Sequence, residues 1–296
     1  MLKTKMIYII LFVSLPFCFL SAQTENFKQT PSRQIVEEIK AHKSGMAIWW
    51  TGHNGWLIKS GNTLIGTDLA LESRERQVAA PISAAELAPL LDISFITHEH
   101  GDHFERKTSR ILAEKGTCLF VMPSNCEEIA LNEVNIPQDR IRVAVPRKPF
   151  SIDEIKIEPL RAIHGNPKFA VFYDANLEDC GYIITIGGKR ILQMGDTVLL
   201  EDHIYASGRR VEKLEHVDIL FFSPTEHNTY IDQSVILINE LEPEYIFPQH
   251  RDTFHVTVQN RYWTTGYPYE VKFRLSKQLQ KNYYVLEMGE KIIIEP

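Results

Sequence analysis

The sequence predicts an α+β protein in which two β-sheets are covered by helices. Short runs of β-branched and aromatic residues, separated by glycine-containing turns, occur in both halves of the 296-residue chain. In each half, several such runs are followed by a stretch in which strand and helix patterns alternate. No charge run or low-complexity linker separates the halves. We therefore expect one domain over residues 46–296, preceded by an extension over residues 23–45.

The first 22 residues have the order of a secretory signal peptide. Met1–Lys5 carries two lysines and no acid, Met6–Leu20 is almost wholly apolar, and Ser21-Ala22 offers small residues before a cleavage point. The apolar run is short for a bilayer span, and an uncleaved N-terminal anchor is the alternative interpretation. We predict a signal peptide over residues 1–22, export to the periplasm or the extracellular medium, and no membrane span after cleavage.

Turn glycines divide the first part of the domain into short strands, and apolar residues at helical spacing mark the helices. Ile35 and Ile39 also predict a short amphipathic helix in the extension. In chain order, the predicted elements are strands Met46–Trp50, Trp56–Lys59 and Thr63–Thr67, helix Ala84–Leu91, strand Ile93–Thr97, helix Phe104–Lys115, strand Thr117–Met122 and a helix opened by a capping box at Ser124-x-x-Glu127.

The second half repeats this order, with strands first and an alternation of strand and helix afterwards. Gly187-Gly188 and Gly289-Glu290 are typical hairpin turns. The predicted elements are strands Ile155–Ile163, Phe169–Tyr173, Tyr182–Ile186, Arg190–Met194 and Ile219–Phe222, helix Asp232–Leu241, strand Tyr245–Phe247, helix Val271–Leu279 and a closing hairpin over Tyr284–Ile294.

Composition and charge exclude several classes of protein. With 44% hydrophobic and 24% charged residues, the chain is an ordinary globular protein rather than a disordered or polytopic membrane protein. Its formal charge of −6 becomes −8 when Lys3 and Lys5 leave with the leader. Because nucleic-acid binders normally carry a basic stripe, we expect no nucleic-acid partner.

Three cysteines remain after the leader, namely Cys118, Cys126 and Cys180. An odd number does not form a disulfide framework, so the alternatives are one bridge with a free thiol or three buried thiols. None of the three lies in a CxxC motif, which excludes cysteine-rich zinc modules.

The sequence His98-Glu99-His100-Gly101-Asp102-His103 follows an apolar strand and precedes a helix. Residues two apart on an extended chain point the same way, so His98 and His100 can bind one metal ion. Gly101 permits a sharp turn, after which Asp102 and His103 can bind a second ion. A solvated polar loop is the alternative, but crowded histidines beside an aspartate are costly without a function.

Four side chains from one loop cannot complete two metal sites, so further ligands must come from elsewhere. His164, Asp196 and His250 each follow a predicted strand, and two of the three adjoin a glycine. Open sheets present functional groups at the carboxyl ends of their strands. We therefore predict seven metal ligands, which are His98, His100, Asp102, His103, His164, Asp196 and His250.

With this set of ligands, the chain resembles the metallo-β-lactamase-fold metallohydrolases from Met46 to Ile294. The stretches Thr51–Ile58, Gly66-Thr67-Asp68 and Met288–Ile292 are similar to one branch, which contains the L-ascorbate-6-phosphate lactonase and the N-acyl-phosphatidylethanolamine-hydrolysing phospholipase D. The resemblance implies a four-layer αββα sandwich.

The resemblance also implies roles for the ligands. His98, His100 and His164 would bind one metal, Asp102, His103 and His250 the other, and Asp196 would bridge them. A bridging hydroxide would attack the substrate, and Asp102 would act as a catalytic residue that orients it and passes on its proton. All-N/O ligation suits two zinc ions, with manganese or iron as alternatives. Asp196 stands where zinc β-lactamases have a cysteine, which argues against antibiotic hydrolysis.

The predicted function is hydrolysis of an ester, lactone or phosphodiester in a small-molecule or lipid-derived substrate. The alternatives are a metal- or ligand-binding protein without turnover, and a phosphodiesterase acting on nucleotide or nucleic acid. His227 is a candidate catalytic residue that could contact substrate or donate a proton. The alternative interpretation is that His227 is an ordinary surface histidine. We expect His53 to hydrogen-bond to a ligand rather than to bind metal. The aromatic residues between Tyr262 and Tyr269 would either wall the pocket or pack in the core.

Overall fold

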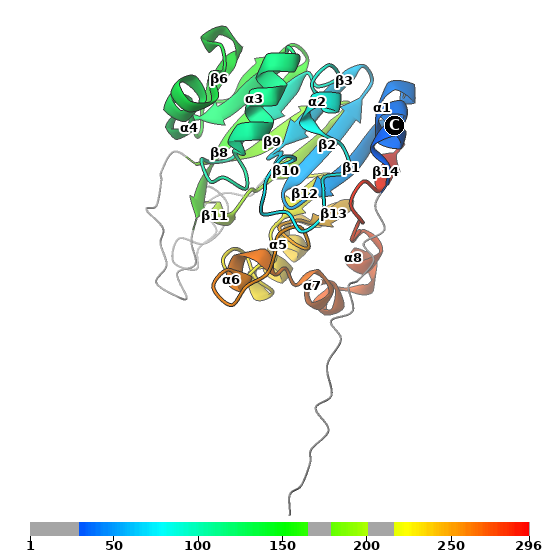
Figure 1. Cartoon of the computed structure of the whole chain (residues 1–296). Helices are drawn as coiled ribbons and strands as arrows, with labels where there is room; N and C mark the ends of the chain where they lie inside the picture. The colour runs from blue at the N-terminus through cyan, green and yellow to red at the C-terminus, as the bar shows by residue number, and fades with distance from the viewer. Residues whose placement is uncertain (1–29, 165–178, 201–215, 296) are drawn as a thin grey trace, which may run out of the picture.

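Two seven-stranded β-sheets face each other in the middle of the molecule, and helices cover the outer face of each sheet (Figure 1). The computed structural model describes residues 30–164, 179–200 and 216–295. Four layers of this kind confirm the predicted αββα sandwich of the α+β class. The predicted signal peptide, and the predicted strand Phe169–Tyr173, lie outside the described residues.

The first sheet has the strand order β14-β1-β2-β3-β4-β5-β6. The pairs from β14 to β3 are antiparallel, and those from β3 to β6 are parallel. Its strands are β1 (Met46–Gly52), β2 (Gly55–Ser60), β3 (Thr63–Thr67), β4 (Ile93–Phe95), β5 (Leu119–Pro123), β6 (Ile141–Ala144) and β14 (Lys291–Ile294). Its helices are α1 (Ser32–Ala41), α2 (Ala84–Leu87), α3 (Arg106–Lys115) and α4 (Ser124–Ile129), followed by a π-helical turn over Ala130–Val134 and a 3₁₀ turn over Gln138–Arg140.

The second sheet has the order β11-β8-β9-β10-β12-β13, and β7 also pairs with β8. Strands β10, β12 and β13 are parallel to one another. Its strands are β7 (Phe150–Ile152), β8 (Ile155–His164), β9 (Cys180–Ile186), β10 (Lys189–Gln193), β11 (Thr197–Leu200), β12 (Ile219–Phe222) and β13 (Tyr245–Pro248). Its helices are α5 (Asp232–Leu241), α6 (Arg261–Thr264), α7 (Pro268–Arg274) and α8 (Lys277–Lys281).

Alternation along the strands explains why both faces of each sheet are buried. In β1, Ala47 and Trp49 join the core beneath the helices, whereas Ile48 and Trp50 join the core between the sheets. Successive side chains of a strand point to opposite faces, so one strand supplies both cores. Full burial of a side chain such as Ile48 contributes about 2 kcal/mol. A third core joins the second sheet to α5, α7 and α8.

Several local predictions were wrong, at residues that pair in a sheet or pack in a core. Ser124 does not cap α4, because Pro123 extends β5 to the first residue of the helix. The predicted helix Val271–Leu279 is interrupted at Leu275, whose backbone is extended, and Ser276 caps a new helix. Residues 284–294 form no hairpin, because Lys291–Ile294 pairs with β1 instead.

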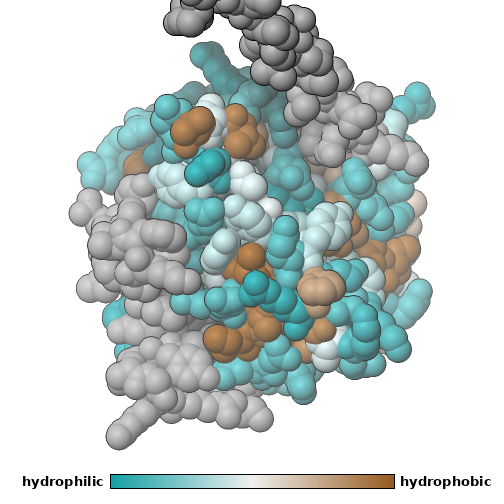
Figure 2. All heavy atoms as spheres, turned by 90° about the horizontal axis from the view of Figure 1, so that it is seen from below, coloured by the Kyte–Doolittle hydropathy of each residue, from teal (hydrophilic) through white to brown (hydrophobic). Residues whose placement is uncertain are grey.

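The helix layer over the second sheet forms the lower face of the molecule. Hydrophilic residues predominate in Figure 2, which shows this face, and the hydrophobic ones form small separate groups. Phe273 and Tyr269 are 85% and 67% exposed there. Within the described residues, no helix has the length and apolarity needed to cross a bilayer. The thiols of Cys118, Cys126 and Cys180 are all buried and unbridged.

Candidate metal centre

The histidine-rich loop begins where β4 ends and is held by a neighbouring strand end. Asp68, which follows β3, accepts hydrogen bonds from Thr97 N (2.9 Å) and Thr97 Oγ1 (2.8 Å). Asp68 Oδ2 also lies 2.9 Å from Nδ1 of His103. Phe104 N donates to His100 O at 2.7 Å, which closes the turn. These bonds orient the imidazole of His103 so that Nε2 faces the centre of the site.

Two segments distant in sequence complete the other side of the site. His53 lies in the turn between β1 and β2, and His250 follows β13. Both have left-handed backbones, with φ of 54° and 57°. A non-glycine residue in this region is strained, and the surrounding contacts hold it there. His250 N donates to His53 O at 3.0 Å, and His53 N donates to Thr253 Oγ1 at 2.5 Å.

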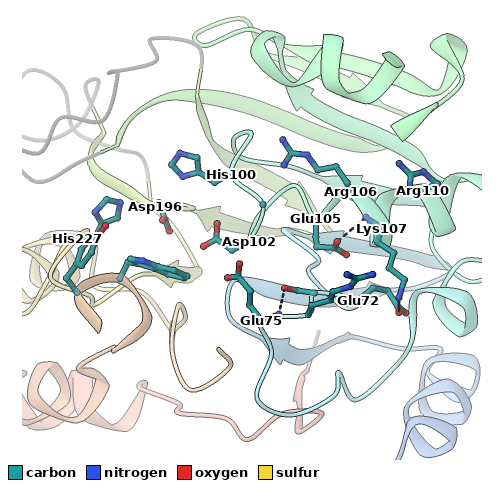
Figure 3. Close-up of a pocket in the computed structure, with 15 residues that line it drawn as sticks. Glu72, Glu75, His100, Asp102, Glu105, Arg106, Lys107, Arg110, Asp196 and His227 are labelled. Carbon is teal, nitrogen blue, oxygen red and sulfur yellow. Dashed lines mark hydrogen bonds and ion pairs between the residues drawn. The ribbon is translucent and has the colours of Figure 1, made fainter. Parts of the chain in front are cut away.

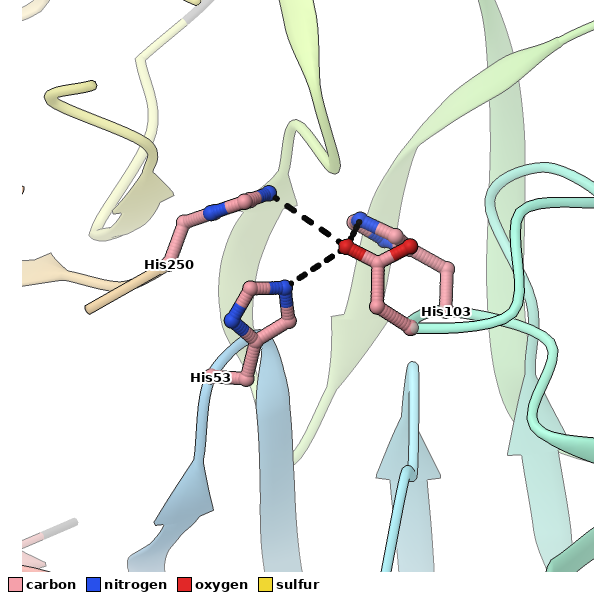
Figure 4. A group of neighbouring side chains, drawn as sticks. His53, His103 and His250 are labelled. Carbon is pink, nitrogen blue, oxygen red and sulfur yellow. Dashed lines mark hydrogen bonds and ion pairs between the residues drawn. The ribbon is translucent and has the colours of Figure 1, made fainter. Parts of the chain in front are cut away.

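The first group of converging side chains surrounds one oxygen of Asp102 (Figure 4). Asp102 Oδ2 lies 2.8 Å from Nε2 of His53, 3.6 Å from Nε2 of His103 and 3.7 Å from Nε2 of His250. One nitrogen or oxygen from each of these four residues lies within 4.8 Å of the others. This spacing fits a single metal ion, because metal–ligand bonds of about 2.1 Å place ligand atoms about 3–4 Å apart.

The second group consists of His98, His103 and Asp196, whose ligand atoms also lie within 4.8 Å of one another. Asp196 follows β10, and its two oxygens face different histidines. Oδ1 is 3.2 Å from Nε2 of His103, and Oδ2 is 3.0 Å from Nε2 of His250. His103 therefore belongs to both groups, and Asp196 lies between His103 and His250. This arrangement can place two cations side by side.

The other predicted site residues are His100, His164 and His227, and the structure describes the side chains of His100 and His227 only. The His100 ring lies 4.6 Å from the His98 ring, centroid to centroid, and His100 also lines the adjoining cavity. His164 ends β8 opposite Thr197. The side chain of His164 is outside the described part of the structure. His227 lines the cavity and is 7% exposed, and its backbone N donates to Tyr262 O at 3.1 Å.

Sequence reasoning missed a layer of buried amides beneath the cluster. Asn54 Nδ2 donates to Asp196 Oδ1 at 3.1 Å. Below it, Gln249 Nε2 donates to Gln193 Oε1 (2.9 Å), and Trp56 Nε1 donates to Gln249 Oε1 (2.9 Å). All of these side chains are 0–4% exposed. The layer ties the two sheets together directly under the ligands. Of the three buried amides, only Asn54 could have been noticed from the sequence, because it lies in the stretch Thr51–Ile58 that carries the family resemblance.

Burial and neighbouring charges have opposite effects on the pKa values of Asp102 and His103. Burial would raise the pKa of Asp102, but His103 and His53 outweigh it and hold that pKa well below its usual value. Burial would lower the pKa of His103, but the charges of Asp196, Asp102 and Asp68 hold it well above its usual value. Burial, with the charge of His250, lowers the pKa of His53 to about 3, so His53 stays neutral.

The donor set fits divalent cations. Asp68 and Asp102 form ion pairs only with histidines within the described residues, and no lysine or arginine there pairs with either carboxylate. Buried carboxylates need compensating positive charge, and the raised pKa of His103 reflects that demand. Imidazole nitrogens and carboxylate oxygens are the ligands of zinc, manganese and iron sites.

A cavity of about 740 Å³ opens beside the cluster (Figure 3). His100, Asp102 and Asp196 form the part of its lining nearest the cluster, and the cavity is large enough for a small-molecule ligand. The aromatic residues that follow the last ligand divide into two pairs. Tyr262 and Trp263 line the cavity, whereas the Tyr267 hydroxyl donates to Glu226 and Tyr269 is exposed.

Known proteins share both sequence and fold with this chain. A UPF0173 metal-dependent hydrolase of Symbiobacterium thermophilum is 26% identical over 216 residues, 73% of this chain and 88% of the relative. A metallo hydrolase from Ignicoccus hospitalis superposes with a TM-score of 0.63 at 19% identity, covering 85% of this chain and 99% of that one. A possible metal-dependent hydrolase from Veillonella parvula superposes with a TM-score of 0.65 at 15% identity, covering 85% and 100%.

At these identities the two structural likenesses concern the fold alone. The sequence family described as the beta-lactamase superfamily domain matches residues 62–251. This range contains every predicted metal ligand and most of both sheets. The chain therefore belongs to the beta-lactamase superfamily domain family and has the metallo-β-lactamase fold.

Proposed function

We propose that the protein is a metal-dependent hydrolase with two divalent cations, which cleaves an ester, lactone or phosphodiester. The observation that carries this proposal is the convergence of two groups of histidine and aspartate side chains that share His103. Relatives of this chain are named metal-dependent hydrolases, which supports the same class of activity. The early strands resemble a branch that contains a lactonase and a phospholipase D, which makes lactones and phosphodiesters candidate substrates.

In this proposal, His98, His100 and His164 would bind one cation. Asp102, His103 and His250 would bind the other, and Asp196 would contribute a ligand to both. His53 donates its hydrogen bond to Asp102 and orients that carboxylate rather than binding metal, because its Nε2 is already 2.8 Å from Oδ2. Zinc suits this set best, and manganese and iron are the alternatives.

The bound cations would lower the pKa of a coordinated water and polarise the substrate oxygen, which is the chemistry a hydrolase needs. Asp102 lies at the cavity side of the cluster and is placed to accept a proton from the attacking water. His227 lines the same end of the cavity and is placed to donate a proton to the leaving group. Tyr262 and Trp263 line the cavity as well.

The proposal is tested with purified protein and two chromogenic substrates, 4-nitrophenyl butyrate and bis(4-nitrophenyl) phosphate. We expect turnover of one or both, loss of turnover after treatment with a chelator, and recovery when zinc or manganese is added back. Elemental analysis should give two equivalents of metal per active chain. Two bound metals with no turnover of either compound would instead favour a metal-binding protein.

We also propose that the protein is exported and acts on a small-molecule or lipid-derived substrate outside the cytoplasm. The lysine pair and apolar run of residues 1–20 support export. N-terminal sequencing of the native protein should find Gln23 as the first residue. A native protein that retains Met1 in the cytosol would refute the proposal.

A further inference from the structure

The cavity beside the metal centre differs in charge between its two ends. In Figure 3, His100, Asp102, Asp196 and His227 lie at one end, and Lys107 and Arg110 lie at the other. Glu75 also lines the cavity, which adds a further carboxylate to its lining. Lys107 and Arg110 belong to the first turns of α3, and Glu72 and Arg74, from the loop after β3, also line the cavity. A ligand in this cavity therefore meets two chemically distinct surfaces.

The acidic side chains of the α3 end are already engaged. Glu105 caps α3 by accepting hydrogen bonds from Lys107 N (3.0 Å) and Thr108 N (2.7 Å). Glu72 accepts a hydrogen bond from Ala84 N at 3.1 Å and pairs with Lys107 Nζ at 3.2 Å. Their negative charge is therefore offset by the helix N-terminus and by the lysine.

The arginines that line the cavity retain donors that no described group uses. Arg74 is exposed and forms no hydrogen bond or ion pair within the described residues. Arg110 donates only from Nη2, to Glu133 O at 2.7 Å. Arg106 donates from Nη1 to Glu99 O at 2.7 Å and to Phe104 O at 2.8 Å, and its Nε lies 3.9 Å from an exposed Glu133 carboxylate. Guanidinium groups bind carboxylates and phosphates through paired N–H donors.

We infer that the substrate carries an anionic group, a carboxylate or a phosphate, at a distance from the bond that is cleaved. Arg74 and Arg110 bind this group at the α3 end, while the reacting bond lies at the metal-binding end. This inference rests on the proposed hydrolase function. It deepens that function by giving the substrate a charge and an orientation.

The test compares a neutral and an anionic ester with the same leaving group, 4-nitrophenyl butyrate and mono-4-nitrophenyl glutarate, on the metal-loaded enzyme. We expect kcat/KM to favour the glutarate, and this preference to fall about tenfold in the double variant Arg74→Gln/Arg110→Gln. Arg74→Gln alone breaks no described bond, so it keeps the test valid where the double variant is unstable. Arg33→Gln, an exposed arginine of α1 outside the cavity, is the matched control.

Isothermal titration calorimetry with glutarate and with glycerol 3-phosphate measures how tightly each anion binds to the wild type and to the same variants. The inference predicts that the double variant weakens binding of at least one of them about tenfold and that Arg33→Gln weakens neither. Equal preference for the two esters in the wild type and in both variants, with unchanged anion binding, would overturn it. If neither ester is cleaved but the arginine variants still weaken anion binding, the proposed function fails for esters and the anion site stands.

Discussion

The metal-binding cluster and the cavity wall beside it are built in opposite ways. His103, Asp196 and His250 are 1%, 4% and 0% exposed, and a further buried side chain orients His103 and Asp196. Arg74 and Glu75, on the cavity wall, are exposed and have no side-chain partner within the described residues. The cluster is thus fixed before any ligand arrives, whereas the wall can adjust to what binds.

This difference follows from what each region must do. Metal ligands must hold their geometry closely, so strand ends, left-handed backbones and buried amides constrain them. A wall that recognises substrate needs only charge and shape at a suitable distance, and solvent-exposed loops supply both. Substitutions in the cluster should therefore affect the reaction itself, and substitutions in the wall should affect the choice of substrate.

The largest effect is expected for Asp102→Ala in the cluster. The change removes both a metal ligand and the carboxylate placed to accept a proton, so kcat should fall by about 10³-fold or more. The same change should lower the melting temperature little. Asp139→Ala, an exposed aspartate in the 3₁₀ turn, is the control and should leave kcat unchanged. A near-normal rate at full metal occupancy would refute the role of Asp102.

The second effect concerns the amide layer beneath the cluster. Asn54→Ala removes the hydrogen bond to Asp196, so metal affinity should fall by about 10–100-fold. A competition titration with a chromophoric chelator measures the change. Asn62→Ala, in the exposed turn after β2, should leave affinity unchanged. If the two variants bind metal equally well, the amide layer supports the fold and does not tune the site.

A smaller effect is expected for His227→Gln on the cavity wall. Proton donation matters only where the leaving group is a poor one, so the rate should fall about tenfold for an alkyl ester and little for a 4-nitrophenyl ester. Metal content should not change. His255→Gln, an exposed histidine in the loop after β13, is the control. An equal loss for both leaving groups would show that His227 positions substrate instead.

The smallest effect on turnover is expected for Asp179→Asn. This substitution should instead change how the free energy of unfolding depends on pH. Burial and the charge of Glu99 raise the pKa of Asp179 to about 7. A carboxyl whose folded pKa is raised stabilises the fold at low pH, and this contribution is lost as the pH rises from about 4 to about 7. Relative to wild type, the variant should therefore gain about 1–4 kcal/mol in the free energy of unfolding over this range.

Urea unfolding of the metal-free protein at pH 4 and pH 8 measures that difference. Asp139→Asn is the control, because its carboxyl is exposed. A constant difference between Asp179→Asn and wild type at the two pH values would contradict the raised pKa of Asp179.

The elements best predicted from sequence are those that local pattern determines. Strands β1 to β3 and helix α5 lie where turn glycines and helical spacing placed them. The hairpin predicted over Tyr284–Ile294 failed, because the partner of β14 is β1, more than 200 residues earlier in the chain. Strands β6 and β7 were missed because they are short and only partly buried, so they lack a clear period.

The sequence by itself determined the chemistry of the site, because His98, His100, Asp102 and His103 lie within six residues and local geometry alone brings such neighbours together. Only the tertiary structure decided which distant groups meet them. His53 reaches Asp102 across 49 residues, and Asn54 reaches Asp196 across 142, because two sheets packed face to face bring their strand ends to one edge. The charge pattern of the cavity depends on the same packing, since it combines α3, the loop after β3 and α6. Contacts of this kind depend on the pairing of strands, which no local pattern encodes.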